Sequence, residues 1–306
     1  MDAPRYCYRH PDRETGLSCS ECGRPICYEC MTPAPVGLRC PEHSGKPQGV
    51  RKVTRPMQQA VTGVGSNRVN AVTMTLIGIN VAVFVAELAV GGTINGQGNW
   101  IYRHGALFAS GVYFGGGVFP APPGAGGLAT VGVAHGEWWR LITAAFLHGG
   151  VLHLGINMLV LWWFGPPLEE YLGRARFIGL YLAACLAGSA GALLQAPLAP
   201  TVGASGAFFG ILGAMAILEW QATGRVGGNV AALIAINLAL SFAIPNVSWG
   251  GHVGGLIGGV LVMLAYSHWG KGHAAYGRLG LAGILGVVLV SAGSVAIAYW
   301  KVRGLA

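Results

Sequence analysis

Eight Cys and His residues near the N-terminus form four pairs with the same spacing. Each pair has two intervening residues: Cys7 and His10, Cys19 and Cys22, Cys27 and Cys30, Cys40 and His43. Thiolate sulfur and imidazole nitrogen are the donors that zinc prefers, and a two-residue spacer lets one turn present both donors to one ion. Eight ligands fill two tetrahedral sites and leave no open position. We therefore expect two structural Zn²⁺ ions.

The order of the pairs favours an interleaved arrangement, because only four residues separate the second pair from the third. This predicts one site of Cys7, His10, Cys27 and Cys30, and a second of Cys19, Cys22, Cys40 and His43. A set of disulfides is the alternative, which the two His residues and a reducing cytoplasm disfavour. The pattern resembles a B-box type zinc finger, and this resemblance implies contact with another protein. The seventh cysteine, Cys185, is expected to be a small packing residue.

A second group of reactive residues lies in the apolar part of the chain. Ser205 belongs to the run Gly203-Ala204-Ser205-Gly206 at the start of one apolar segment, and His252 opens another. A serine is a weak nucleophile until a base takes its proton. An isolated run of this kind more often packs or caps a helix, and a lone His is more often a satisfied core residue. Ionisable groups inside a membrane are costly, however, which favours a functional interpretation.

Glycines are spaced so that these two segments can approach each other. Gly255 and Gly259 share one helical face with His252, and Gly206 and Gly210 have small-xxx-small spacing in the other segment. Contact between the two backbones would bring the hydroxyl and the imidazole within hydrogen-bond reach. The sequence contains no Asp or Glu within or just before the segment at 250 to 267. A Ser-His dyad is therefore predicted, without the carboxylate of a triad.

The run LHGGVLHLGIN supplies His148, His153 and Asn157. His153 and Asn157 are four residues apart on one helical face and could donate hydrogen bonds to a negative oxygen that forms during acyl transfer. Together with the backbone N–H of Ser205 they predict an oxyanion hole. The alternative is that polar residues bind helices together, and for His148 both interpretations stay open.

Apolar runs must position these residues. With 53% hydrophobic and 10% charged residues, the 306-residue chain cannot enclose itself as a soluble globule. Seven runs approach the ~20 residues that span hydrocarbon. They lie near 70 to 90, 146 to 165, 176 to 195, 204 to 220, 229 to 245, 250 to 267 and 279 to 300. We predict an all-α polytopic membrane domain at 70–300, preceded by a zinc module at 1–45 and a basic flexible linker at 46–69.

The net charge of +8 is spread over short segments between the apolar runs, which indicates membrane topology and not nucleic-acid binding. The residues on one side are Arg51, Lys52, Arg55, Arg68, Arg174, Arg176, Arg225, Lys271 and Arg278. This distribution places the N-terminus in the cytoplasm and the C-terminus outside. The segment 91 to 139 is rich in Gly and Pro and is expected to be an outside loop partly embedded in lipid.

Taken in order, the motifs of residues 70 to 300 resemble those of the rhomboid intramembrane serine proteases. The matching residues are Glu137-Trp138-Trp139-Arg140, His148 with His153 and Asn157, Gly203-Ala204-Ser205-Gly206, and His252 with Gly255 and Gly259. The resemblance implies a six-helix catalytic core with a seventh, C-terminal helix. It implies nucleophile Ser205, base His252, the oxyanion donors named above, and no metal or cofactor for catalysis.

The resemblance also assigns supporting residues. Phe209 matches an aromatic ring that packs against the histidine, and Glu137 and Arg140 match residues that fix the first outside loop. For Trp138 and Trp139 the alternative is anchoring at the membrane interface. The first outside loop is longer and richer in Gly than the family pattern.

These observations predict an endopeptidase in a prokaryotic plasma membrane. It would cut transmembrane protein substrates in or near their membrane segments, where helix breakers expose the peptide carbonyl. One alternative is a rhomboid-like protein that binds membrane clients without cutting them, which retention of Ser205 and His252 disfavours. A transporter or channel would need polar groups along a path through the bilayer, whereas here they gather near one face.

Overall fold

The computed structural model describes residues 5–33, 38–44, 70–93, 99–114, 117–121, 130–245, 247–268 and 281–305. The chain divides into two compact units, Met1–Thr62 and Gly63–Ala306. The predicted linker at 46–69 lies outside the described residues, as do Lys271 and Arg278. The domain boundaries at 45 and 70 therefore stay predictions.

The N-terminal unit consists of two short hairpins and one helical turn. Strands β1 (Tyr6–Cys7) and β2 (His10–Glu14) are antiparallel, as are β3 (Thr32–Pro33) and β4 (Leu38–Arg39), and α1 spans Pro41–Ser44. Its buried core residues are Cys7, Cys19, Ile26, Cys27, Cys30 and Cys40. Since Ile26 is the one aliphatic side chain among them, the cysteines themselves form the interior of this unit.

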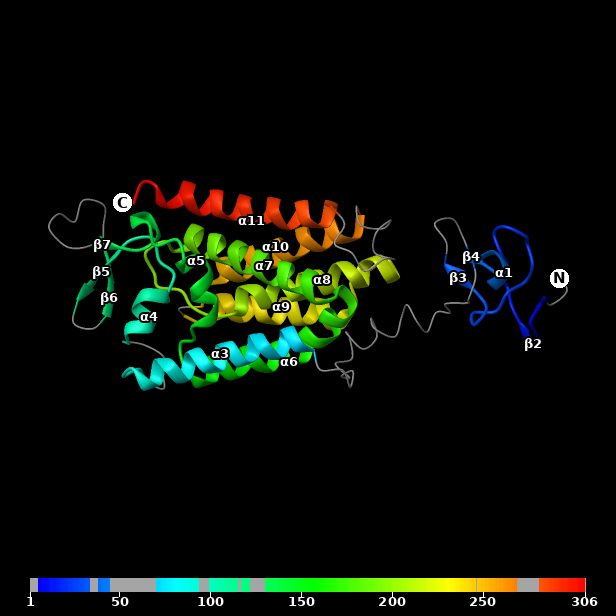
Figure 1. Ribbon diagram of the computed structural model, residues 1–306, viewed down its shortest axis with the longest axis horizontal. Helices are drawn as coiled ribbons and strands as arrows, with labels where there is room; N and C mark the ends of the chain where they lie inside the picture. The colour runs from blue at the N-terminus through cyan, green and yellow to red at the C-terminus, as the bar shows by residue number, and fades with distance from the viewer. Residues whose placement is uncertain are drawn as a thin grey trace. The chain divides into compact units, whose positions relative to one another are not determined.

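Among its described residues, the second unit has seven long helices, at the places that the apolar runs predict. They are α3 (Ala71–Ala89), α6 (Val151–Leu172), α7 (Arg174–Gln195), α8 (Ser205–Thr223), α9 (Gly228–Ala243), α10 (Trp249–His268) and α11 (Leu281–Val302). Figure 1 shows them side by side with consecutive helices running in opposite directions. Five of them, α3, α6, α7, α10 and α11, are long and apolar enough to cross a membrane.

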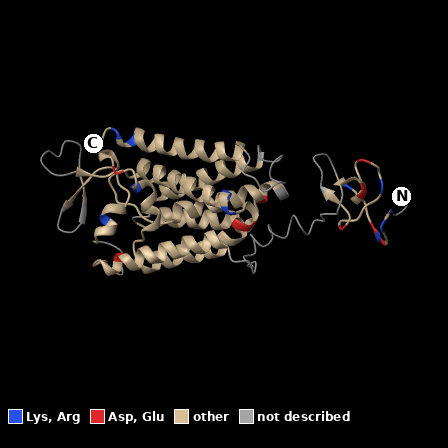
Figure 2. Cartoon of the chain, in the orientation of Figure 1, with Lys and Arg blue, Asp and Glu red and all other residues tan. Residues whose placement is uncertain are grey.

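Charged side chains are scarce along these helices and lie mostly near their ends (Figure 2). That distribution suits segments that pass through hydrocarbon, where an unpaired charge is costly. The predicted all-α polytopic fold is confirmed, and the chain is an integral membrane protein.

Helix α7 lies at the centre of the bundle and contacts α8, α10 and α11. It is the most deeply buried of the five candidate spans, with two thirds of its apolar window enclosed by other elements. Glycines permit this packing: a β-carbon on Gly250 would lie 2.5 Å from the carbonyl oxygen of Gly191. Helices α3 and α6 pair with each other on one side of the bundle (Figure 1).

The segment between α3 and α6 is more ordered than the expected loop. It contains α4 (Trp100–Gly105), a three-stranded antiparallel sheet of β6 (Gly117–Pro120), β5 (Gly111–Phe114) and β7 (Thr130–Val131), and the short helices η1 (Val133–His135), α5 (Arg140–Thr143) and η2 (Ala144–Phe146). Figure 1 places the sheet at the same end of the bundle as the C-terminus. The sequence did not predict these strands, because Gly and Pro obscure strand periodicity.

Arg140 connects the parts of this segment. Its guanidinium is fully buried and donates to the Glu137 carboxylate at 2.8 Å and to the carbonyl oxygens of Arg103 and Ala106 at 2.8 and 2.7 Å. It also donates to the Tyr113 hydroxyl at 3.0 Å. A planar guanidinium with five N–H donors can satisfy this many acceptors at once. These contacts are those that a loop-fixing role requires.

A buried carboxylate joins α6 to the start of α3. Glu169 accepts hydrogen bonds from the backbone N–H groups of Val72 and Thr73 at 3.0 and 2.8 Å and from the Thr73 hydroxyl at 2.8 Å. The first N–H groups of a helix lack intrahelical partners, and the positive end of the helix dipole favours an anion there. Glu169 therefore caps α3 from a neighbouring helix.

Replacing Glu169 with alanine is expected to lower the free energy of unfolding by about 3 kcal/mol, because three donors lose a charged acceptor. Titration with SDS in mixed micelles, followed by tryptophan fluorescence, measures the change. Glu170→Ala is the matched control, since Glu170 is the adjacent carboxylate and is exposed. Equal stability of the two variants would contradict the capping role.

Candidate active site and metal clusters

The side chains of Ser205 and His252 meet although 46 residues lie between them. Ser205 Oγ lies 2.8 Å from His252 Nε2, within hydrogen-bonding distance. Ser205 is the first residue of α8, and His252 lies in the first turn of α10. Both side chains are half-buried, and their places at the helix starts put the pair at one end of the bundle.

Glycines in α8 and α10 make this meeting possible. A β-carbon on Gly255 would overlap the carbonyl oxygen of Gly206, and one on Gly259 would overlap that of Gly210. With hydrogen at these positions the two backbones touch directly, as in small-xxx-small helix pairs. The predicted glycine face thus lies where α8 and α10 pack together.

Two further contacts orient the imidazole of His252. The Phe209 ring stacks on it, with centroids 4.4 Å apart and planes at 20°. On the other edge of the ring, Nδ1 lies 2.5 Å from the hydroxyl oxygen of Ser241 in α9. Sequence reasoning included Phe209 but missed Ser241, although a lone polar residue in the apolar run ALSFA was an available signal.

His153 faces the space beside the Ser205 hydroxyl. Gly203 has φ +124°, and a β-carbon there would lie 2.7 Å from His153 Cε1, 2.8 Å from His153 Nε2 and 3.8 Å from Ser205 Oγ. The backbone N–H of Gly149 donates to His153 Nδ1 at 3.2 Å, so in the neutral ring the proton sits on Nε2. That N–H is directed toward Gly203 and can serve as a donor.

Asn157 lies one turn after His153 in α6 and is buried. Its Nδ2 donates to the carbonyl oxygen of His153 at 2.9 Å, which uses one of its two N–H bonds. His148 precedes α6 and is fully buried, with its ring 5.2 Å from that of His153 at an angle of 64°. Neither ring nitrogen of His148 has a hydrogen-bond partner among the described residues. Its contact with His153 is therefore edge-to-face ring packing.

The paired tryptophans directly precede Arg140 and contact other elements. The indole N–H of Trp139 donates to the carbonyl oxygen of His104 at 2.9 Å while half of its surface is exposed. Trp138 lies beside Tyr299 of α11, with ring centroids 6.2 Å apart. Both exposed indoles suit anchoring at a membrane interface.

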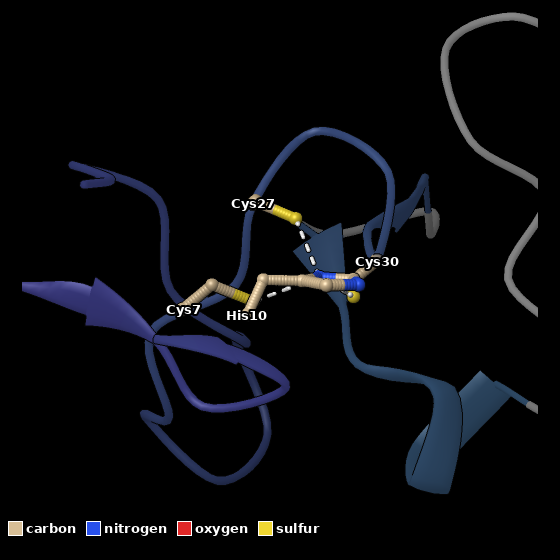
Figure 3. A group of neighbouring side chains, drawn as sticks. All are labelled: Cys7, His10, Cys27 and Cys30. Carbon is tan, nitrogen blue, oxygen red and sulfur yellow. Dashed lines mark hydrogen bonds between the residues drawn. The ribbon is translucent and has the colours of Figure 1, made fainter. Parts of the chain in front are cut away.

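In the N-terminal unit, Cys7, His10, Cys27 and Cys30 form one cluster that could hold a metal ion. Figure 3 shows the imidazole of His10 turned toward the cysteine sulfurs. Its Nδ1 lies 3.8, 3.4 and 3.3 Å from the sulfurs of Cys7, Cys27 and Cys30. Burial disfavours the Cys7 thiolate, but backbone hydrogen bonds, chiefly at Cys27, outweigh it and lower the pKa of that thiol to about 6.

A second cluster consists of Cys19, Cys22, Cys40 and His43. His43 Nδ1 lies 3.8 Å from the sulfur of Cys19 and 3.1 Å from that of Cys40, and the sulfurs of Cys22 and Cys40 are 3.8 Å apart. A tetrahedral zinc site requires edges of about 3.5 Å between sulfur and nitrogen and about 3.8 Å between sulfurs. Both clusters match these edges, and their membership is that of the interleaved arrangement.

Comparisons with known proteins agree in pointing to one family. The Rhomboid domain model matches residues 135–269. The chain is 40% identical over 161 residues to rhomboid protease GluP of Bacillus subtilis (strain 168), covering 51% of this chain and 31% of GluP. It is 39% identical over 137 residues to the putative rhomboid protease YdcA of the same organism, covering 43% of this chain and 69% of YdcA.

A eukaryotic relative, rhomboid-like protease 3 of Toxoplasma gondii, is 31% identical over 138 residues, or 43% of this chain and 52% of that protein. The chain thus spans about a third of the length of GluP and about two thirds of YdcA. The matched region contains the Ser205–His252 pair and the helices that hold it. On its likeness to YdcA over most of that protein's length, this chain belongs to the rhomboid family.

Proposed function

We propose that this protein is an intramembrane serine endopeptidase that cuts other membrane proteins with a Ser205–His252 dyad. The observation that supports it best is the 2.8 Å contact between Ser205 Oγ and His252 Nε2. A hydroxyl becomes an effective nucleophile when a base can take its proton in this geometry. The likeness to rhomboid protease GluP and the putative rhomboid protease YdcA favours the same activity.

In the first half of the reaction, Ser205 Oγ attacks the carbonyl carbon of the scissile peptide bond while its proton passes to His252 Nε2. The C–N bond then breaks, and the imidazolium gives that proton to the departing amine. In the second half, water attacks the acyl-enzyme with His252 again as base. Both residues lie in the first turns of their helices, where water can reach them from the end of the bundle.

The negative oxygen that forms in each half needs donors that are already in place. His153 Nε2–H, the second amide hydrogen of Asn157 and the backbone N–H of Ser205 supply them. The Ser205 N–H begins α8 and has no intrahelical partner, so it is available to an anion. Gly203 leaves the space open, and His148 supports His153 through ring packing. Donors of this kind contribute a large part of the rate in acyl transfer.

The substrates are transmembrane proteins with a locally unstable helix near the bilayer surface. An intact helix hides its peptide carbonyls, so the bond must lie where helix breakers open the backbone. Basic residues at the ends of α7 and α8, including Arg174 and Arg225, favour a cytoplasmic location for that end of the bundle in a prokaryotic cell. The dyad, the sheet and the C-terminus then face outward.

The N-terminal unit binds two structural Zn²⁺ ions in a B-box-like arrangement and contacts a protein partner in the cytoplasm. Its core cluster consists of five cysteines and Ile26, so an apolar core is too small to hold it. Four ligands fill each site, which leaves no position for a reacting water. The catalytic dyad itself uses no metal or cofactor.

Binding of membrane clients without cleavage is the alternative function. It needs the same helices but makes no use of a hydroxyl hydrogen-bonded to an imidazole. Cleavage by the wild-type chain and its loss in a Ser205 variant therefore separate the two functions.

Wild-type protein in detergent is expected to react with a fluorophosphonate probe and to cut a transmembrane test substrate in liposomes. Ser205→Ala should abolish labelling and cleavage, because the nucleophilic oxygen is gone. His252→Ala should lower both rates by a factor on the order of 1000 or more, as loss of a triad member does. In-gel fluorescence and product analysis provide the readouts. Ser291→Ala in α11 is the control, and labelling of Ser205→Ala equal to wild type would contradict the mechanism.

Asn157→Ala is expected to lower kcat about 100-fold with a small change in KM, because a donor to the transition state is lost. Steady-state kinetics in micelles measure the effect. Asn80→Ala is the matched control: this buried asparagine in α3 donates to its own helix in the same way, to Leu76 at 2.7 Å. An unchanged kcat in Asn157→Ala would remove Asn157 from the oxyanion hole.

Metal analysis of the purified full-length chain is expected to find about two zinc ions per chain. Replacing Cys7 and Cys27 together with serine should leave about one, because one ligand set loses two thiolates while the other is intact. Cys185→Ser keeps both ions, since Cys185 is buried in α7 outside the clusters. A wild-type chain without zinc would refute the proposed metal sites.

A further inference from the structure

Ser241 is buried in a helix that otherwise faces outward. Only 3% of its surface is exposed, whereas Ile236, Leu240 and Phe242 of the same helix are 57%, 48% and 64% exposed. Val230 and Ser241 are the buried side chains among the described residues of α9. A hydroxyl in this position needs internal partners, because lipid offers none.

The Ser241 hydroxyl has two partners, and one of them determines the direction of both hydrogen bonds. Its oxygen lies 2.5 Å from the backbone carbonyl oxygen of Asn237 and 2.5 Å from His252 Nδ1. A carbonyl oxygen can only accept, so the single hydroxyl hydrogen goes to Asn237. The Ser241 oxygen must then accept a proton from Nδ1.

This direction settles which nitrogen of His252 carries the proton in the neutral ring. With hydrogen on Nδ1, Nε2 presents its lone pair to Ser205 Oγ, 2.8 Å away. The four groups form one chain in which every donor points the same way: Ser205 hydroxyl to His252, His252 to Ser241, and Ser241 to the Asn237 carbonyl. The ring is thus held as a base toward Ser205.

We propose that Ser241 is a positioning residue for the dyad, which holds His252 in the tautomer that accepts the Ser205 proton. This inference rests on the proposed function. In the attack step the Ser205 O–H bond breaks, an Nε2–H bond forms, and the freed electron pair of Oγ bonds the substrate carbonyl carbon. The Nδ1–H bond stays intact throughout, and its hydrogen bond to Ser241 stabilises the imidazolium. Ser241 takes the orienting place that a carboxylate occupies in a triad.

The placement of α9 therefore affects the active site. Ser241 is the group through which this helix contacts the imidazole, and the neighbouring Phe242 stacks on Trp249 at the start of α10, with centroids 5.3 Å apart. The placement of α9 against α10 therefore sets whether the acceptor reaches Nδ1.

The test compares Ser241→Ala and Ser241→Thr with wild type, as full-length protein in micelles with a transmembrane peptide substrate. Ser241→Ala removes one hydrogen bond to His252, so it is expected to lower kcat about tenfold and to leave KM nearly unchanged. Ser241→Thr, which keeps the hydroxyl, should restore most of the rate. Ser294→Ala is the matched control, because the buried Ser294 of α11 also donates to its own helix, to the Val290 carbonyl at 2.7 Å.

Nitrogen-15 NMR of histidine-labelled protein reads the tautomer directly, with the His252 signals assigned from a His252→Gln sample. Wild type is expected to carry the proton on Nδ1, and Ser241→Ala should show a mixture or the Nε2–H form. A wild-type His252 with its proton on Nε2 would overturn the proposal even if Ser241→Ala fails to fold. So would a wild-type kcat in Ser241→Ala. Cleavage that persists in Ser205→Ala would refute the protease function instead and leave the tautomer result standing.

Discussion

Direct contact between helix backbones is the constraint on which the site depends. Between α8 and α10 the contact runs through Gly206 and Gly255, and then through Gly210 and Gly259, with no side chain in between. In lipid, helices gain little from burying apolar surface against each other, so such close packing supplies much of their association. The same closeness leaves the side chains at the helix starts only 2.8 Å apart. A single methyl group at Gly255 would push the two backbones apart.

Polar side chains inside the bundle follow a second constraint, which is that each must find its partner within the protein. Glu169 meets the free N–H groups of α3, Arg140 meets carbonyl oxygens of the segment between α3 and α6, and Ser241 meets both Asn237 and His252. Apart from the Ser241–Asn237 bond, which lies within α9, each of these contacts joins separate elements of the chain. Buried polar groups therefore fix how the helices and the loop are arranged, while the apolar surface faces lipid.

The N-terminal unit has a different kind of interior. Its core cluster consists of five cysteines and one isoleucine. Each of its two candidate metal clusters combines residues from two separate Cys or His pairs. An ion bound at such a cluster links two loops at once, which a core of this size could not do. The long helices described in the membrane domain instead pack against one another over extended surfaces.

The sequence by itself determined the positions of the long helices, the membrane class and the family, because the lengths of the apolar runs and the order of the motifs can be read directly from it. It also supplied the candidate site residues: the Cys and His pairs, Ser205, His252, His153 and Asn157. Only the tertiary structure decided what each of them touches, including the bond from His252 to Ser241, the Glu169 cap and the strands around Arg140. The physical reason is that periodicity reports the faces within one helix, whereas partners across helices depend on the depth and rotation that packing sets.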